Sequence, residues 1–242
     1  MNEFQSQNQR YSQPQDWSNM NSFAAQPAAQ VSVAERMTFI RKVYALFFVG
    51  TLFAIAGVGI AFVFDPLMYA VAYHPFIALI LMLGAVMGAQ AVRHVPGVNL
   101  LALFGFTTLT GIVISPLVAV VSQNNPNSLV QAGVLTVGIF GGLTAYAFIS
   151  KKDFSFLRGM VVTGLIVVIL AGVLNIFLAS SAFSFAISTA ALILFSGFVL
   201  YDTSNIMRRY PTNEYVAGAL ALYLDFWNIF LALLRILNAG RR

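Results

Sequence analysis

The sequence predicts an all-α, polytopic membrane protein with seven transmembrane helices. Of its 242 residues, 59% are hydrophobic and only 9% are charged, and the mean hydropathy is +0.82. A soluble domain carries about 25% charged residues. No charged residue occurs between Val43 and Phe64 or between Val98 and Ser150. Uncharged runs of this length favour one membrane domain over one or two soluble domains.

The first 34 residues differ from the rest of the chain in composition. They are rich in Gln, Asn, Ser and Ala and show no apolar periodicity. Such a segment cannot bury enough apolar surface to offset the entropy lost on ordering. It also lacks the basic start and short apolar core of a signal peptide. We therefore expect a disordered cytoplasmic tail over residues 1–34 and the membrane domain over residues 35–242.

Seven apolar stretches are long enough to cross the hydrocarbon core of a bilayer, which needs roughly 20 residues. They cover about residues 43–64, 75–92, 98–121, 129–149, 159–179, 183–203 and 215–237. The segments between them contain Pro, Gly, Asn and Asp, which are typical of turns. Two small-residue motifs, Gly84-x-x-x-Gly88 and Gly138-x-x-x-Gly142, would let neighbouring helix backbones approach closely.

The basic residues predict the orientation of these helices. They precede the first span and follow the second, fourth and sixth spans, at Arg36, Arg41, Lys42, Arg93, Lys151, Lys152, Arg158, Arg208 and Arg209. The alternate loops, near residues 65–74, 122–128 and 179–183, contain no Lys or Arg. Because cytoplasmic loops carry the excess of basic residues, we expect a cytoplasmic N-terminus in the inner (plasma) membrane. Seven crossings then place the C-terminus outside, although its three late arginines oppose that placement.

Several classes of function are excluded by the residues that the sequence lacks. The chain contains no Cys, which excludes disulfides and Cys-ligated zinc or iron–sulfur clusters. It has only His74 and His94 and no His-Glu-x-x-His motif, so a zinc protease has no ligands. The basic residues are scattered singly between apolar runs, which indicates topology rather than nucleic-acid binding. We expect no cofactor and no resident metal.

Two aspartates in the last two spans are the main candidates for function. An ionisable residue inside a membrane costs roughly 2.5–3.5 kcal/mol on insertion scales, so it is functional by default. Asp202 lies eight residues before Tyr210, and Asp225 lies twelve residues after Asn213, on the two arms of a helical hairpin. At 1.5 Å per residue their depths differ by only about 6 Å. Carboxylates at matched depth can share a proton, bind a cation or clamp an arginine between them, and would sense pH.

Paired aspartates on neighbouring spans also suggest an intramembrane aspartyl protease, because such a pair can activate water. Asp225, however, follows Leu222-Tyr223-Leu224 rather than the Gly-x-Gly that precedes the aspartate in that family. We therefore expect no enzyme activity.

Three segments resemble the Bax inhibitor family, also called the transmembrane Bax inhibitor motif family. They are KKDFSFL at 151–157, FSGFVLYDT at 195–203 and LYLDFWNIFL at 222–231. The likeness extends over about residues 35–237 and is most specific in the last two spans. It implies a seven-helix fold in which the last helix is central. It also implies a pH-sensitive calcium leak across the membrane, with calcium as the permeant ion.

The family's pH sensor is an aspartate pair on helices six and seven, bridged to an arginine on helix two. Asp202 and Asp225 match that pair by motif, and Arg93 is the only arginine near the inner end of the second span. Arg235 resembles a late helix-seven arginine that pairs with a helix-two glutamate in some members. The second span here contains no acidic residue, so the resemblance implies that this secondary latch is absent or altered.

The resemblance also leaves a second function open. Bacterial relatives are associated with a membrane-anchored AAA protease, as its substrate and modulator. The expected tail over residues 1–34 would suit that function, because an energy-dependent protease needs a loose end to grip. Apart from such a protease, the predicted partners are the lipid bilayer and the calcium ion.

Overall fold

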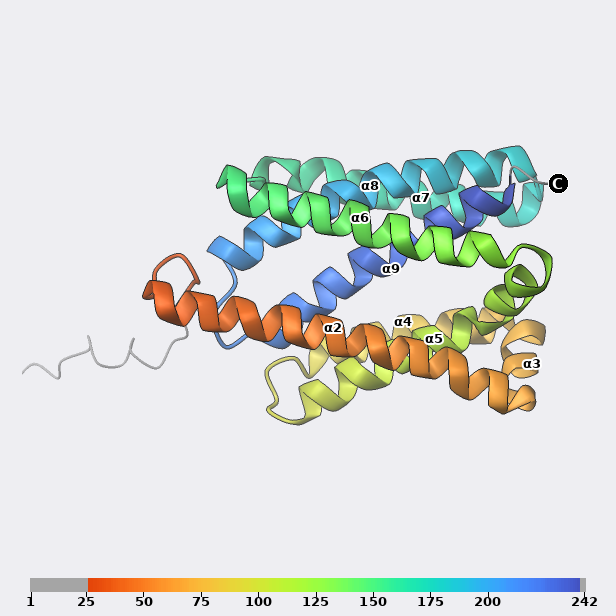
Figure 1. Ribbon diagram of the computed structural model, residues 1–242, viewed down its shortest axis with the longest axis horizontal. Coiled ribbons are helices and arrows are strands. Elements are labelled where there is room, and N and C mark those ends of the chain that lie inside the picture. The colour runs from red at the N-terminus through yellow and green to blue at the C-terminus, as the bar shows by residue number, and fades with distance from the viewer. Residues whose placement is uncertain (1–25, 240–242) are drawn as a thin grey trace, which may run out of the picture.

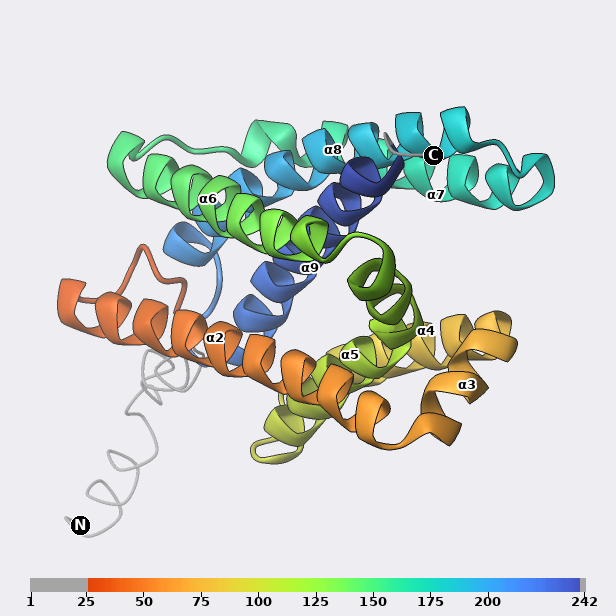
Figure 2. The same cartoon turned by 45° about the vertical axis from the view of Figure 1, so that its right-hand side comes forward.

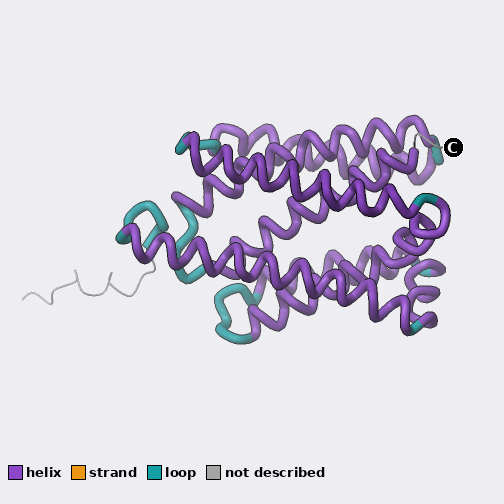
Figure 3. Tube along the Cα trace, in the orientation of Figure 1, coloured by secondary structure: helices purple, strands orange, loops and turns teal. Residues whose placement is uncertain are grey.

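A computed structural model describes residues 26–239, which form a bundle of helices with no strand in that part of the chain (Figure 1; Figure 3). The helices are α2 Val33–Val63, α3 Asp65–Tyr73, α4 Pro75–Ala91, α5 Val98–Asn124, α6 Pro126–Ser150, α7 Arg158–Leu178, α8 Ser181–Arg208 and α9 Tyr215–Ala239. Helix α2 begins at one end of the bundle and α9 finishes at the opposite end (Figure 1). The all-α, polytopic fold is confirmed.

Six of these helices are each long and apolar enough to cross a membrane. The seventh crossing is available only if α3 and α4 count as one span, because they are bent by 99° at the break between them. Pro66 is the second residue of α3 and Pro75 is the first residue of α4. Proline suits the first turn of a helix, and Pro75 also disfavours helical backbone at His74, which separates α3 from α4. The predicted loop over residues 65–74 is therefore wrong in detail, since nine of its residues form a helix.

The ordered chain begins before residue 35, where the membrane domain was expected to start. Ala28 is fully buried, and its backbone N–H donates to the carbonyl of Tyr210 at 2.9 Å, in the turn between α8 and α9. Ser32 then caps α2 by accepting the backbone N–H of Glu35 at 3.2 Å. This cap allows α2 to start ten residues before the predicted apolar edge at Val43. Residues 1–25, most of the expected tail, lie outside the described residues.

The last helix occupies the centre of the bundle. Figure 2 shows α9 crossing between a layer formed by α6, α7 and α8 and a second layer formed by α2, α4 and α5. In α9, 44% of the most apolar window is buried within the protein, against 6% in α7. The central position predicted for the last helix is confirmed. Most of α7, in contrast, is exposed on the outside of the bundle.

The closest approach between helices in this fold joins α2 to α5 through two glycines. A Cβ atom on Gly57 would lie 2.2 Å from the backbone oxygen of Thr108, and one on Gly111 would lie 1.9 Å from that of Ala54. No side chain fits at either position, so the two backbones are in direct contact. This contact fixes α2 against α5.

The two predicted Gly-x-x-x-Gly motifs do not make such contacts. A Cβ atom added to any of their glycines would meet nothing within 4 Å, at Gly84, Gly88, Gly138 and Gly142. That prediction is wrong because the motif identifies only the spacing of small residues on one helix. It does not say which face of that helix is turned toward a neighbour.

Candidate functional site

The structure brings Asp202 and Asp225 together across the antiparallel hairpin of α8 and α9. Asp225 is only 3% exposed. Its carboxyl interacts with that of Asp202, and its Oδ2 atom has no hydrogen-bond partner among the described residues. A buried carboxylate oxygen normally has a partner, so this atom is available to a proton, a cation or water.

Three hydroxyl groups extend this polar region away from the hairpin. Tyr44 on α2 faces Thr144 on α6 and Thr203 on α8, and its hydroxyl also interacts electrostatically with Asp225. Thr144 and Thr203 lie close enough to Tyr44 to influence its hydroxyl, but within residues 26–239 none of the three oxygens has a hydrogen bond of normal geometry. Four helices therefore direct unpaired oxygen atoms toward one region of the bundle interior.

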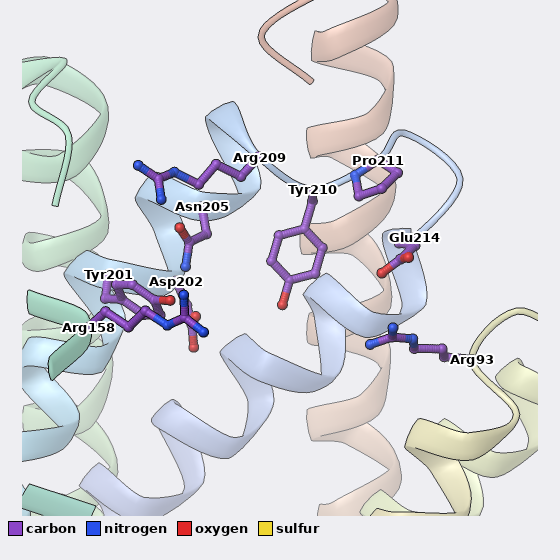
Figure 4. Close-up of a pocket in the computed structure, with 9 residues that line it drawn as sticks. All are labelled: Arg93, Arg158, Tyr201, Asp202, Asn205, Arg209, Tyr210, Pro211 and Glu214. Atoms are coloured by element: carbon purple, nitrogen blue, oxygen red, sulfur yellow. The ribbon is translucent and has the colours of Figure 1, made fainter. Parts of the chain in front are cut away.

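A cavity of about 360 Å³ opens beside this region, at the end of the bundle where α8 turns into α9. Its walls are Arg93, Arg158, Tyr201, Asp202, Asn205, Arg209, Tyr210, Pro211 and Glu214 (Figure 4). Asp202 thus lies at the cavity wall, while Asp225 is not among its lining residues. One carboxyl of the pair therefore borders the open cavity, and the other lies in the buried interior.

Arg93 lines the same cavity but is not bonded to the aspartates. Its Nε atom donates to Nε2 of His94 at 3.0 Å, and that nitrogen lies 3.8 Å from Oε1 of Glu214. In the part of the chain that is described, Arg93 forms no ion pair with Asp202 or Asp225. Figure 4 shows Arg93 and Glu214 on one side of the cavity and Asp202 on the other.

A sequence profile described as "Inhibitor of apoptosis-promoting Bax1" matches residues 36–242. The chain belongs to the Bax inhibitor family. Among its relatives, mouse "Protein lifeguard 4" is 34% identical over 214 residues, which cover 87% of this chain and 89% of that protein. "Bax inhibitor 1" of Schizosaccharomyces pombe is 34% identical over 224 residues, covering 88% and 80%. A membrane protein of Vibrio cholerae is 39% identical over 176 residues, covering 70% and 78%.

Sequence reasoning missed several charged and polar residues of the cavity in this Bax inhibitor family member. Arg158 and Arg209 were interpreted only as topology signals and Tyr210 only as part of a turn, and Glu214 was given no role. All four line the cavity with Asp202. They come from segments far apart in the chain, so no spacing in the sequence relates them. The only signal in the sequence that could have identified them as site residues is their position in or beside loops.

The pKa values of Asp153 and Tyr210, two groups near the cavity, are shifted from their usual values. The backbone N–H of Ser155 and then the guanidinium of Arg209, whose Nη2 lies 2.9 Å from Oδ2, hold the pKa of Asp153 below its usual value. Burial, and next the nearby charge of Asp202, raise the pKa of Tyr210 above its usual range. Tyr210 therefore presents a neutral hydroxyl to the cavity, and Asp153, which pairs with the lining residue Arg209, stays ionised.

Arg235 lies apart from these groups. It lines a second cavity of about 360 Å³, formed where α7, α8 and α9 meet at the other end of the bundle. No acidic residue lines this second cavity, and none of the described acidic residues pairs with Arg235. The structure does not bring Arg235 together with Asp202, Asp225 or Arg93.

Proposed function

We propose that this family member is a pH-sensitive calcium leak channel rather than an enzyme, gated by Asp202 and Asp225. The observation that carries the proposal is the position of the aspartate pair. Asp225 is buried with an unpaired carboxylate oxygen, and it faces a second carboxyl on the wall of an open cavity. Protons from the cavity can reach such a pair, and its charge decides what it binds.

In this proposal, Arg93 is the group that responds to the charge of the pair. An ionised Asp202 or Asp225 attracts Arg93 and closes the cavity end, and protonation releases it. Arg93 now donates to Nε2 of His94, which accepts only while His94 is neutral. Reaching Asp202 therefore requires Arg93 to exchange the His94 nitrogen for a carboxylate oxygen. A charge-assisted hydrogen bond of that kind is stronger than a neutral one.

Calcium is the ion that suits this path. Ca²⁺ prefers oxygen ligands in a flexible arrangement, including carboxylates and water. The two carboxyls and the hydroxyls of Tyr44, Thr144 and Thr203 supply only oxygen. In this role calcium passes through and is not held as a resident metal.

The proposal places the cavity at the cytoplasmic face of the inner membrane. Basic residues gather at the end of the bundle that contains the cavity. Because cytoplasmic loops carry the excess of Lys and Arg, this supports a cytoplasmic position. Reporter fusions at residue 152 should then behave as cytoplasmic, and fusions at residue 125 as external. The reverse result at either position contradicts the orientation.

Calcium flux into liposomes that contain only the purified protein tests the function. We expect flux that changes with pH, and we expect Asp225→Asn to flatten that change because a neutral amide cannot titrate. Asp65→Asn is the matched control, since it removes the same charge from an exposed residue of α3 far from the cavity.

Two results would count against the channel. One is the absence of flux, which would instead suit a protein that only modulates a partner such as a membrane-anchored AAA protease. The other is an unchanged pH profile in Asp225→Asn, which would place the sensor elsewhere.

A further inference from the structure

The second cavity combines an unpaired cation with several polar groups. Its polar lining residues are Asn175, Ser180, Ser181, Ser184, Arg235 and Asn238. Leu117 and Leu234 supply its apolar wall. Arg235 is the charged member of this set, and across residues 26–239 its guanidinium has neither a hydrogen bond nor an ion pair. A cation at the edge of a bilayer that lacks a protein partner is expected to find an anion or water.

The start of α8 adds a second positive feature to the same cavity. The first N–H groups of a helix have no acceptor within it, and the helix dipole makes that end positive. The Oγ atom of Ser180 accepts the N–H of Phe183, which leaves those of Ser181 and Ala182 open. Helix α8 has 28 residues, so its dipole is fully developed. Two positive features therefore face one cavity, and none of its described lining residues carries a carboxylate.

Asn175 supplies an independent sign that the cavity has an occupant. Its Oδ1 atom is buried without a hydrogen-bond partner among the described residues. The side-chain amide also carries two N–H donors. A buried oxygen that is left unpaired normally marks a bound water or another donor, such as a hydroxyl of a ligand. The guanidinium, the amide N–H groups and the α8 N–H groups offer donors to an acceptor-rich anion, and the Oδ1 acceptor requires a hydroxyl or water beside that anion.

We propose that this cavity binds a phosphate group, supplied by the headgroup of an anionic phospholipid. Arginine binds phosphate through two parallel hydrogen bonds, and a helix N-terminus favours the same charge. Arg235 lies four residues before the end of α9, about 6 Å along the helix axis, which is the depth of lipid headgroups. The adjoining end of α7 exposes Ile176, Phe177 and Leu178. Acyl chains of a bound lipid can therefore lie directly against α7.

The test measures binding in the full-length purified protein, without reference to ion flux. Phosphatidylglycerol is compared with diacylglycerol, which has similar chains and no phosphate, and with inorganic phosphate alone. We expect phosphatidylglycerol, and not diacylglycerol, to raise the Tm of the wild type by about 4 °C. Arg235→Gln should lose this shift and Arg235→Lys should retain part of it. Arg41→Gln, an exposed arginine at the other end of the bundle, should keep the whole shift.

A second measurement covers the case in which Arg235→Gln folds poorly. Phosphorus retained after purification should fall by about one atom per chain in Arg235→Gln relative to the wild type, and by less in Arg235→Lys, because one guanidinium holds one phosphate group. A shift produced by inorganic phosphate would support the phosphate site and identify free phosphate as a further source. Equal shifts with phosphatidylglycerol and diacylglycerol, or an unchanged response in Arg235→Gln, would overturn the proposal.

Discussion

The two ends of the bundle contain cavities of the same size, about 360 Å³ each, but with different sets of charges. The cavity beside the α8–α9 turn is lined by Asp202 and Glu214 as well as by three arginines. The cavity at the far end is lined by Arg235 and by no acid among the described residues. Charges of both signs allow the first cavity to change its internal pairing. A lone cation can be neutralised only from outside, so the second cavity is suited to binding rather than switching.

The largest effect is expected at the arginines of the first cavity, and it tests whether that cavity changes its internal pairing. Arg93→Ala should abolish the pH response of calcium flux, with the ratio of flux at two pH values falling to about one, because no cation remains to follow the aspartates. Arg158→Ala should keep the response, since Arg158 is proposed only as a wall residue. Flux in liposomes across a pH series measures both. If Arg158→Ala gives the flat profile instead, the clamp is Arg158.

A smaller effect is expected at His94, which competes with the aspartates for Arg93. His94→Ala removes the nitrogen that accepts from Arg93 at 3.0 Å. Arg93 should then reach the carboxylates more readily and favour their ionised forms. The midpoint of flux against pH should move to lower pH by roughly one unit. A midpoint that stays in place, or moves to higher pH, would show that His94 does not compete for Arg93.

A substitution in the second cavity would sharpen the comparison by giving Arg235 a partner of its own. Asn238→Asp introduces a carboxylate three residues along α9, where the two side chains lie on one face of the helix. This carboxylate should compete with the phosphate group and reduce the Tm shift from phosphatidylglycerol to about half, or about 2 °C. Asn238→Gln, which adds no charge, is the matched control. An undiminished shift in Asn238→Asp would mean that Arg235 is not the group that the lipid contacts.

The smallest effect is expected at the rim of the first cavity. Asp153 has a lowered pKa in the folded protein, so its interactions stabilise the fold above the usual aspartate pKa of about 4. That stabilisation is lost as the pH falls through the folded value. Both partners are largely exposed, so Asp153→Asn should lower the Tm by less than about 2 °C at pH 7. The difference between variant and wild type should disappear in strong acid, and a difference that persists there would assign another role to Asp153.

Hydropathy was sufficient to predict the membrane class and six of the seven spans, because it depends only on composition along the chain. Local breaks were harder to predict. The helix at Asp65–Tyr73 is short, begins with Asp65-Pro66 and is followed by Pro75, so its ends resemble a loop in composition. The contacts of Gly57 and Gly111 were missed because each glycine meets the backbone of another helix, which spacing within one helix cannot reveal.

The candidate site was predictable only where its members share one hairpin. Asp202 and Asp225 could be paired by counting residues from a single turn. Arg158, Arg209 and Glu214 join Asp202 at the cavity only after the chain has folded. The bond between Arg93 and His94 was not predicted either, since adjacent residues in a turn can point in any direction.

The backbone contact of α2 with α5 has a mechanical consequence for any opening motion. Helices that pack through side chains can slide past one another by small rotamer changes. At Gly57 and Gly111 there are no side chains to rearrange, and each glycine lies against a main-chain oxygen. Shear between α2 and α5 is therefore blocked, and these two helices move as one rigid unit. We expect movement that widens the interior to occur where α9 meets that unit, because α9 packs against both α2 and α5.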